Sequence, residues 1–222
     1  MKGTSSASAN QQELVAVALL LGWCFALVGY RVHLDPNVFG WALVWNLFLA
    51  TLPLPFALAF ERATQRKQPI VRAFWFVLWL LFFPNAPYIL TDLIHLAPRP
   101  NVPLWFLLAM LLSCAGTGAL LGYFSLARIH RVVEGTSGRA MGWAVVGASL
   151  TLCGFGIYLG RFLRWNSWDA FTHPLKLARS IVAQFADPWP FPHPLYVTVI
   201  FGVGLFIGYL ALRALAASMA AR

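Results

Sequence analysis

Six apolar stretches alternate with short polar connections along the chain. They cover residues 13–30, 38–60, 71–94, 103–126, 140–160 and 195–212. Each approaches the roughly 20 residues that an α-helix needs to cross about 30 Å of hydrocarbon. Backbone polar groups in lipid must find partners within their own segment, and no stretch shows the alternation of a membrane β-barrel. The pattern therefore predicts an all-α membrane protein with six transmembrane helices, forming a single polytopic domain over residues 1–222.

The longest polar connection, residues 161–194, contains a pattern of its own. Between residues 174 and 186, apolar side chains recur at helical spacing opposite Lys176, Arg179 and Gln184. Pro174 would stand in the first turn of this helix, where proline is tolerated. We therefore expect one amphipathic helix lying at the outer surface of the bilayer.

Composition narrows the range of partners. Of the 222 residues, 60% are hydrophobic and 10% are charged, whereas soluble domains carry about 25% charged residues. The net charge of +9 would suit nucleic acid only if the cations formed patches on soluble elements, and here they lie between apolar runs. The expected partner is the lipid bilayer and not nucleic acid. The sequence does not indicate whether the protein is a monomer or an oligomer.

The distribution of Lys and Arg predicts the orientation. The two tight loops at residues 61–72 and 128–139 together hold seven cations: Arg62, Arg66, Lys67, Arg72, Arg128, Arg131 and Arg139. Loops rich in Lys and Arg remain on the cytoplasmic side. With the N-terminus inside, this side holds ten cations and the outer side six. Both termini are therefore expected in the cytoplasm.

The third apolar stretch carries an unusual number of polar residues. If it is helical, Asn85, Tyr88, Asp92 and His95 fall within about 80° of one another and form one stripe. Pro84 and Pro87 would free two carbonyls and bend the helix, since proline lacks an N–H. We expect Asn85 to face protein there, because polar groups are costly in lipid.

Other segments bring polar residues to the same depth. Arg161, at the end of the fifth stretch, lies twenty-two residues after Arg139, and Asp92 lies twenty residues after Arg72. At about 1.5 Å per residue, both reach the outer boundary of the hydrocarbon. Arg164, Asn166 and Asp169 follow Arg161, and Asn46 of the second stretch lies at a depth similar to that of Asn85.

Two interpretations of these residues remain open. In the structural one, Asp92 pairs with Arg161, and Asn46 pairs with Asn85 or with a carbonyl freed by proline; such pairs fix helix packing in lipid. In the functional one, the residues form a site that opens outward. Asp92 and His95 are then the candidates for acid and base catalysis. The candidates for ligand binding are Arg161, Arg164, Asn85, Tyr88, Asn166, Asp169 and Asn46.

Metal and cofactor binding are weaker alternatives. Asp92 and His95 could offer two metal ligands, but no HExxH or paired-histidine motif supports a site. Cys24, Cys114 and Cys153 lie inside apolar stretches and have the character of small buried hydrophobic residues. We therefore predict no metal and no cofactor.

Three segments resemble a known family. They are residues 45–50 (WNLFLA), residues 81–95 (LFFPNAPYILTDLIH) and residues 160–169 (GRFLRWNSWD). They are similar to a family of uncharacterised bacterial integral membrane proteins that is known only as a domain of unknown function, and the similarity extends over residues 38–212. The resemblance implies a location in the bacterial inner membrane and no particular substrate.

These observations support three hypotheses about function. The first is an outward-facing site for an anionic lipid-linked ligand or a small polar ligand. The second is a small transporter or permease, in which the broken third helix lines a path; the almost purely apolar cytoplasmic halves of the spans disfavour it. The third is a non-catalytic assembly factor for another envelope protein. Whether the protein is an enzyme is left open.

Overall fold

A computed structural model describes residues 2–35, 38–99, 101–186 and 193–220. Within these ranges the chain forms helices and no β-strand, with one isolated bridge between Arg99 and Val102. In order, the helices are α1 (Lys2–Leu34), α2 (Val38–Thr51), α3 (Pro53–Gln65), α4 (Pro69–Phe82), α5 (Asn85–Tyr88), the 3-10 helix η1 (Ile89–His95), α6 (Leu104–Ser137), α7 (Arg139–Arg161), α8 (Asp169–Thr172), α9 (Pro174–Ala186) and α10 (Pro194–Ala220).

In the part of the chain that the structure describes, six helical segments are long and apolar enough to cross a membrane. They are Gln11–Leu34, Gly40–Gln65, Pro69–His95, Leu104–Ser137, Arg139–Arg161 and Pro194–Met219. The predicted all-α membrane fold with six transmembrane helices is confirmed. Helix α9 covers the residues predicted to form an amphipathic helix, 174–186. Its position at the bilayer surface stays a prediction.

Several helices are longer than the apolar stretches that predict them. α6 continues to Ser137 instead of ending near residue 126, and α10 continues to Ala220 instead of ending near residue 212. The prediction that Arg128 lies in a loop is wrong. Arg128 is only 5% exposed and forms ion pairs with Glu13 of α1 and Glu61 of α3, and neutralisation by two carboxylates is what permits a buried cation.

Prolines interrupt the second and third spans. Pro53 is the first residue of α3, two residues after Thr51 ends α2. Inside a continuous helix, proline would leave one hydrogen bond unmade because it lacks an N–H. In the third span α4 ends at Phe82, and the chain continues through Pro84 into α5 and then η1. The predicted interruption at residues 84–87 is therefore confirmed.

Three glycines let α6 and α7 approach the bent segment at Pro84 and α5 closely. A Cβ at Gly118 of α6 would clash with the backbone carbonyl of Ala86, and one at Gly122 would lie 3.3 Å from the Ala86 Cβ. On the other side, a Cβ at Gly156 of α7 would lie 2.5 Å from Pro84. The spacing Gly-xxx-Gly permits close approach of membrane helices. Here it allows α6 and α7 to enclose the bent segment.

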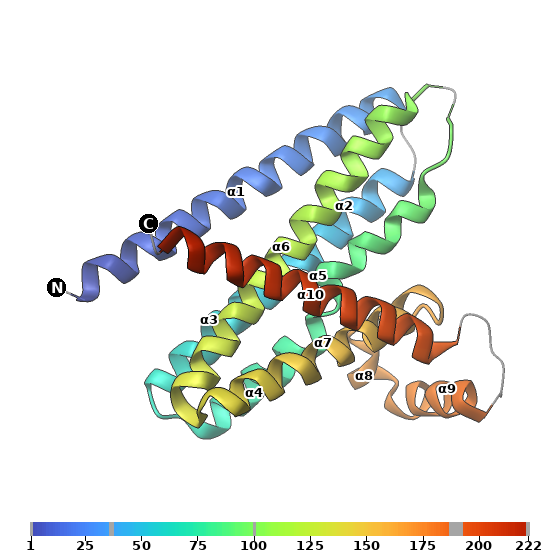
Figure 1. Cartoon of the computed structure of the whole chain (residues 1–222). Helices are drawn as coiled ribbons and strands as arrows, with labels where there is room; N and C mark the ends of the chain where they lie inside the picture. The colour runs from blue at the N-terminus through green and yellow to red at the C-terminus, as the bar shows by residue number, and fades with distance from the viewer. Residues whose placement is uncertain (1, 36–37, 100, 187–192, 221–222) are drawn as a thin grey trace.

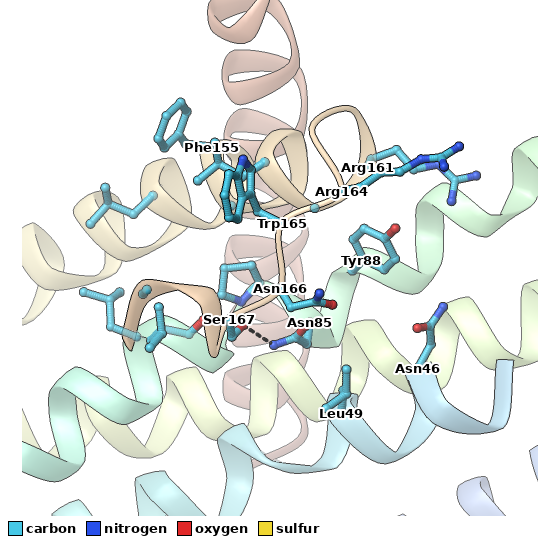
Figure 2. Close-up of a pocket in the computed structure, with 18 of the residues that line it drawn as sticks. Asn46, Leu49, Asn85, Tyr88, Phe155, Arg161, Arg164, Trp165, Asn166 and Ser167 are labelled. Carbon is cyan, nitrogen blue, oxygen red and sulfur yellow. Dashed lines mark hydrogen bonds between the residues drawn. The ribbon is translucent and has the colours of Figure 1, made fainter. Parts of the chain in front are cut away.

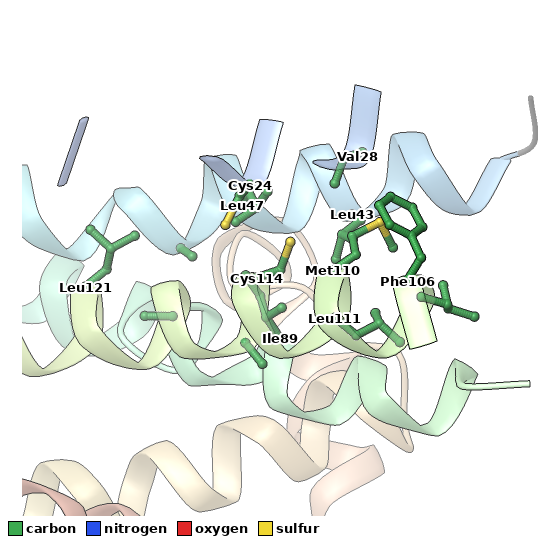
Figure 3. Packing of buried hydrophobic residues seen from close by; sticks show 14 of the residues in the cluster. Cys24, Val28, Leu43, Leu47, Ile89, Phe106, Met110, Leu111, Cys114 and Leu121 are labelled. Atoms are coloured by element: carbon green, nitrogen blue, oxygen red, sulfur yellow. The ribbon is translucent and has the colours of Figure 1, made fainter. Parts of the chain in front are cut away.

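Buried apolar residues form two clusters along α6. One joins α1, α2 and η1 around Leu47, Leu107 and Cys114 (Figure 3). The other joins α3, α4, α7 and α10 around Trp79 and Leu150. The two groups of helices meet along α6 and α5 and spread apart toward the end where α7 terminates and α10 begins (Figure 1). The candidate site lies between them.

Candidate functional site

A cavity of about 900 Å³ lies at this end of the bundle. Its lining comes from α2, α4, α5 and η1 on one side, and from α7, the segment after it, α8 and α9 on the other. Seven of the nine predicted site residues line it: Asn46, Asn85, Tyr88, His95, Arg161, Arg164 and Asn166. Asp92 and Asp169 are not part of the lining. Whether a ligand contacts these residues stays a prediction.

Asp92 lies behind the cavity and holds the polar residues in position. Its carboxylate accepts hydrogen bonds from Asn46 Nδ2 at 2.9 Å and from Arg161 at 3.3 Å. The predicted pairing of Asp92 with Arg161 is confirmed, and the side chains are 5% and 13% exposed. The expected partner of Asn46 was Asn85 or a freed carbonyl, and this prediction was wrong. The carboxylate attracts the Asn46 amide because an ion strengthens a hydrogen bond.

The 3-10 geometry of η1 explains why Arg161 has two partners. Side chains three residues apart are eclipsed in a 3-10 helix, so Asp92 and His95 project from the same face. Arg161 contacts His95 Nε2 at 3.0 Å through its second terminal nitrogen. The Arg161 guanidinium is thus held at the cavity wall by two side chains. Since both Asp92 oxygens are engaged, its best-supported role is to position Arg161.

Asn85 connects the broken span to the segment after α7. Its Nδ2 donates to Phe82 O and to Ser167 Oγ, both at 2.9 Å, and Ser167 Oγ in turn donates to Leu81 O at 3.0 Å (Figure 2). Asn85 therefore faces protein, as predicted. Ser167 satisfies a carbonyl near the end of α4 and was not identified as a site residue from the sequence. No local motif marks it, because its partners lie more than eighty residues away.

Arg164 is the most available cation in the cavity. It is exposed, and it has no hydrogen bond or ion pair with any residue that the structure describes. Its backbone is left-handed, with φ of 58°, a conformation that costs a non-glycine residue about 1 kcal/mol or more. The turn lets Trp165 N–H donate to Leu159 O at 3.0 Å. Arg161 and Arg164 extend in the same direction, toward the side where the Tyr88 hydroxyl points (Figure 2).

Asp169 organises the segment after α7 from outside the cavity. Its Oδ2 accepts hydrogen bonds from the Asn166 backbone N–H at 2.8 Å and from Asn166 Nδ2 at 3.3 Å. The backbone N–H of Asn166 holds the pKa of the Asp169 carboxyl below its usual value, because it stabilises the ionised form. Asp169 therefore fixes Asn166, which does line the cavity.

The remaining walls are apolar and come from α4 and α7. They include Phe76, Val77 and Leu80 of α4 and Leu152, Phe155 and Leu159 of α7. Val77 is 57% exposed and Leu152 is 49% exposed, so the walls continue to the lateral surface of the bundle. Sequence reasoning missed these residues, since apolar side chains that line a cavity look the same in sequence as those that face lipid.

The chemistry available is hydrogen bonding and the binding of negative charge. Two guanidinium groups, an imidazole, three amides and a phenol converge on one cavity, and arginine is well suited to phosphate and carboxylate groups. Within the described ranges, no three His, Cys, Asp or Glu side chains lie together in a way that could hold a metal ion.

Comparison with known proteins identifies a family. The model of the family described as "Protein of unknown function (DUF1361)" matches residues 45–210, most of the chain and all of the residues that line the cavity. The chain belongs to this family. The resemblance inferred from the three segments is thereby confirmed. No curated protein and no solved structure matches the chain.

Proposed function

We propose that the protein binds an anionic, lipid-linked ligand in the cavity between α4, α5 and α7. The negative group lies against Arg161 and Arg164, and the hydrocarbon chain lies against Phe76, Leu80 and Phe155. The ligand enters from the bilayer between α4 and α7, where the apolar walls reach the surface of the bundle.

The observation that carries this proposal is the junction of two surfaces in one cavity. Arg164 presents a cation that no described residue neutralises. Directly adjoining it are apolar walls on α4 and α7. A small polar ligand would leave these walls unused, whereas an amphiphile with a negative headgroup contacts both.

The topology supports an outward-facing site. Arg66 and Lys67 lie in the connection between α3 and α4, and Arg139 begins α7 after the one-residue turn at Gly138. These cationic turns lie at the end of the bundle opposite the cavity (Figure 1). By the positive-inside rule they face the cytoplasm, with both termini. The cavity then opens at the outer side of a bacterial inner membrane.

A transporter is less well supported. It requires polar groups along a path to the opposite side. Between Arg72 and Asn85 the third span carries only apolar side chains, and Trp79 and Phe83 stack at 4.8 Å in the buried cluster on that side. Binding from one side is therefore the simpler function. The proposal includes no chemical step: Asp92 lies outside the cavity lining and accepts hydrogen bonds from Asn46 and Arg161.

Binding of decyl phosphate to the purified protein tests the proposal, with decanol as the uncharged control. The variant Arg164→Gly removes the cation and relieves the backbone, so it should fold normally and bind decyl phosphate about tenfold or more weakly, as expected for loss of a charged hydrogen bond. Lys67→Gly is a matched control, since Lys67 is an exposed cation with φ of 56° at the opposite end. Equal binding of decyl phosphate and decanol, or equal losses in the two variants, would refute the proposal.

A further inference from the structure

Two features of the cavity are not explained by a phosphate group. The first is a set of neutral polar groups. Asn46 and Asn166 each donate one side-chain N–H, to Asp92 and to Asp169, and their amide oxygens accept no hydrogen bond from a described residue. The Tyr88 hydroxyl has no hydrogen bond with any described residue. An ionised phosphate has only hydrogen-bond acceptors, so an amide oxygen does not bind it. Amide oxygens bind a ligand that donates hydrogen bonds.

The second feature is an aromatic ring with an unused face. Trp165 is half-buried in the cavity wall, and in the described part of the chain it has no ring contact and no acceptor for its indole N–H. Trp79 shows the usual arrangement: it stacks on Phe83 and donates to Ser125 Oγ at 3.2 Å. A buried tryptophan normally finds a partner for its N–H. Trp165 therefore offers a flat apolar surface and a donor to a ligand.

The two features are close together and held rigidly. Trp165, Asn166 and Ser167 are consecutive and line the same cavity as Asn85 and Tyr88; in Figure 2 the Trp165 ring lies toward Phe155, and the Asn166 side chain lies toward Tyr88. The backbone N–H of Trp165 donates to Leu159 O and that of Asn166 donates to Asp169, while the Ser167 hydroxyl donates to Leu81 O. Such preorganisation reduces the entropy lost on binding.

The size of the cavity also exceeds what a phosphate needs. Sites of roughly 300–1,000 Å³ hold drug-sized ligands, and this one measures about 900 Å³. A ring that carries several hydroxyl groups matches the polar part of the lining, because its hydroxyls both donate to amide oxygens and accept from N–H and O–H groups. Its C–H face packs on an aromatic surface as apolar area does.

From this arrangement we infer that the headgroup is a sugar phosphate: the phosphate lies at Arg161 and Arg164, and the sugar lies between Trp165, Asn166 and Tyr88. The inference rests on the proposed function and names its substrate class. Trp165 then selects a lipid whose phosphate carries a sugar over a lipid phosphate without one.

Binding competition between chain-matched probes tests this inference. The probes are decyl phosphate and its diesters with glucose, galactose and mannose, added to protein purified in a detergent without sugar groups. At least one diester should bind about tenfold more tightly than decyl phosphate, since an aromatic contact with its hydrogen bonds contributes about 1.4 kcal/mol. If no diester exceeds decyl phosphate, the sugar assignment is wrong while the proposed function stands. If no probe exceeds decanol, the proposed function fails as well.

Variants assign the preference to its residues. Trp165→Leu and Asn166→Ala should each weaken binding of the sugar diester by a larger factor than binding of decyl phosphate and so remove the preference, whereas Trp165→Phe should retain part of it. Trp41→Leu is the matched control, because Trp41 lies on α2, is 67% exposed and does not line the cavity. An unchanged preference in both Trp165→Leu and Asn166→Ala would overturn the inference, as would an equal loss in Trp41→Leu.

Discussion

At the scale of single residues, the position of Arg161 depends on a buried carboxylate. Asp92 and Arg161 lie near the end of two different spans, and each would be costly to bury without a partner. Asn46 and His95 complete the hydrogen bonds of the pair. These hydrogen bonds offset the free-energy cost of burying two charges, and they hold Arg161 at the cavity wall.

Asp92→Ala should lower the free energy of unfolding by about 3–5 kcal/mol, because it leaves the Arg161 cation buried without its counterion. Unfolding in sodium dodecyl sulfate, followed by circular dichroism, measures the loss. Asp92→Asn is the comparison: it keeps a hydrogen-bond acceptor for Arg161 and should lie between the wild type and the alanine variant. Wild-type stability in Asp92→Ala would show that water screens the pair and that it does not hold the two spans together.

At the scale of elements, the site depends on the proline break in the third span. In a continuous α-helix, Asp92 and His95 would point in directions about 60° apart around the helix axis. In the 3-10 helix η1 they point in the same direction. The break is accommodated by the glycines of α6 and α7, which let both helices approach α5. The Gly-xxx-Gly pairs at 118–122 and 156–160 therefore act inside one molecule.

Gly118→Ala tests this packing. The added methyl group would meet the carbonyl oxygen of Ala86, and overpacking of a close contact costs about 1–3 kcal/mol. Gly116→Ala is a matched control on the same helix, since no atom lies within 4 Å of its Cβ, and it should be neutral or slightly stabilising because alanine favours helix. Melting temperatures in detergent measure both. Equal stability of the two variants would contradict the close approach of α6 to α5.

At the scale of the whole molecule, the cationic turns and the cavity lie at opposite ends of the bundle. This separation makes the orientation measurable. Pro98 and Ala183 lie at the cavity end and Gln65 at the opposite end, and all three are exposed. The native cysteines are buried, so we expect little labelling of the wild-type protein by a thiol reagent.

Single cysteines at positions 98 and 183 should react with an impermeant maleimide added to intact cells, and a cysteine at position 65 should react only after the cells are opened. The expected contrast follows from the Lys and Arg residues in the two tight turns. The wild-type protein measures the background from its own thiols. The reverse pattern would place the cavity in the cytoplasm and remove the basis for an outward-facing site.

Sequence was sufficient for the features that depend on local composition and on depth. Length and hydropathy identify six spans because lipid imposes one helix length on each, and the prolines identify the break because they lack an N–H. The common depth of Asp92 and Arg161 followed from the constant rise per residue along each helix. These properties are independent of how the spans are arranged around one another.

Lateral packing decided the rest. Asn46 bonds to Asp92 and not to Asn85, Ser167 reaches the carbonyl of Leu81, and Arg128 leaves its expected loop for a buried site between Glu13 and Glu61. Each result depends on which helices are neighbours in the membrane plane, and hydrophobic periodicity carries no information about that. The cavity has the same origin, because apolar side chains of α4 and α7 become cavity walls only through the way these helices are placed relative to each other.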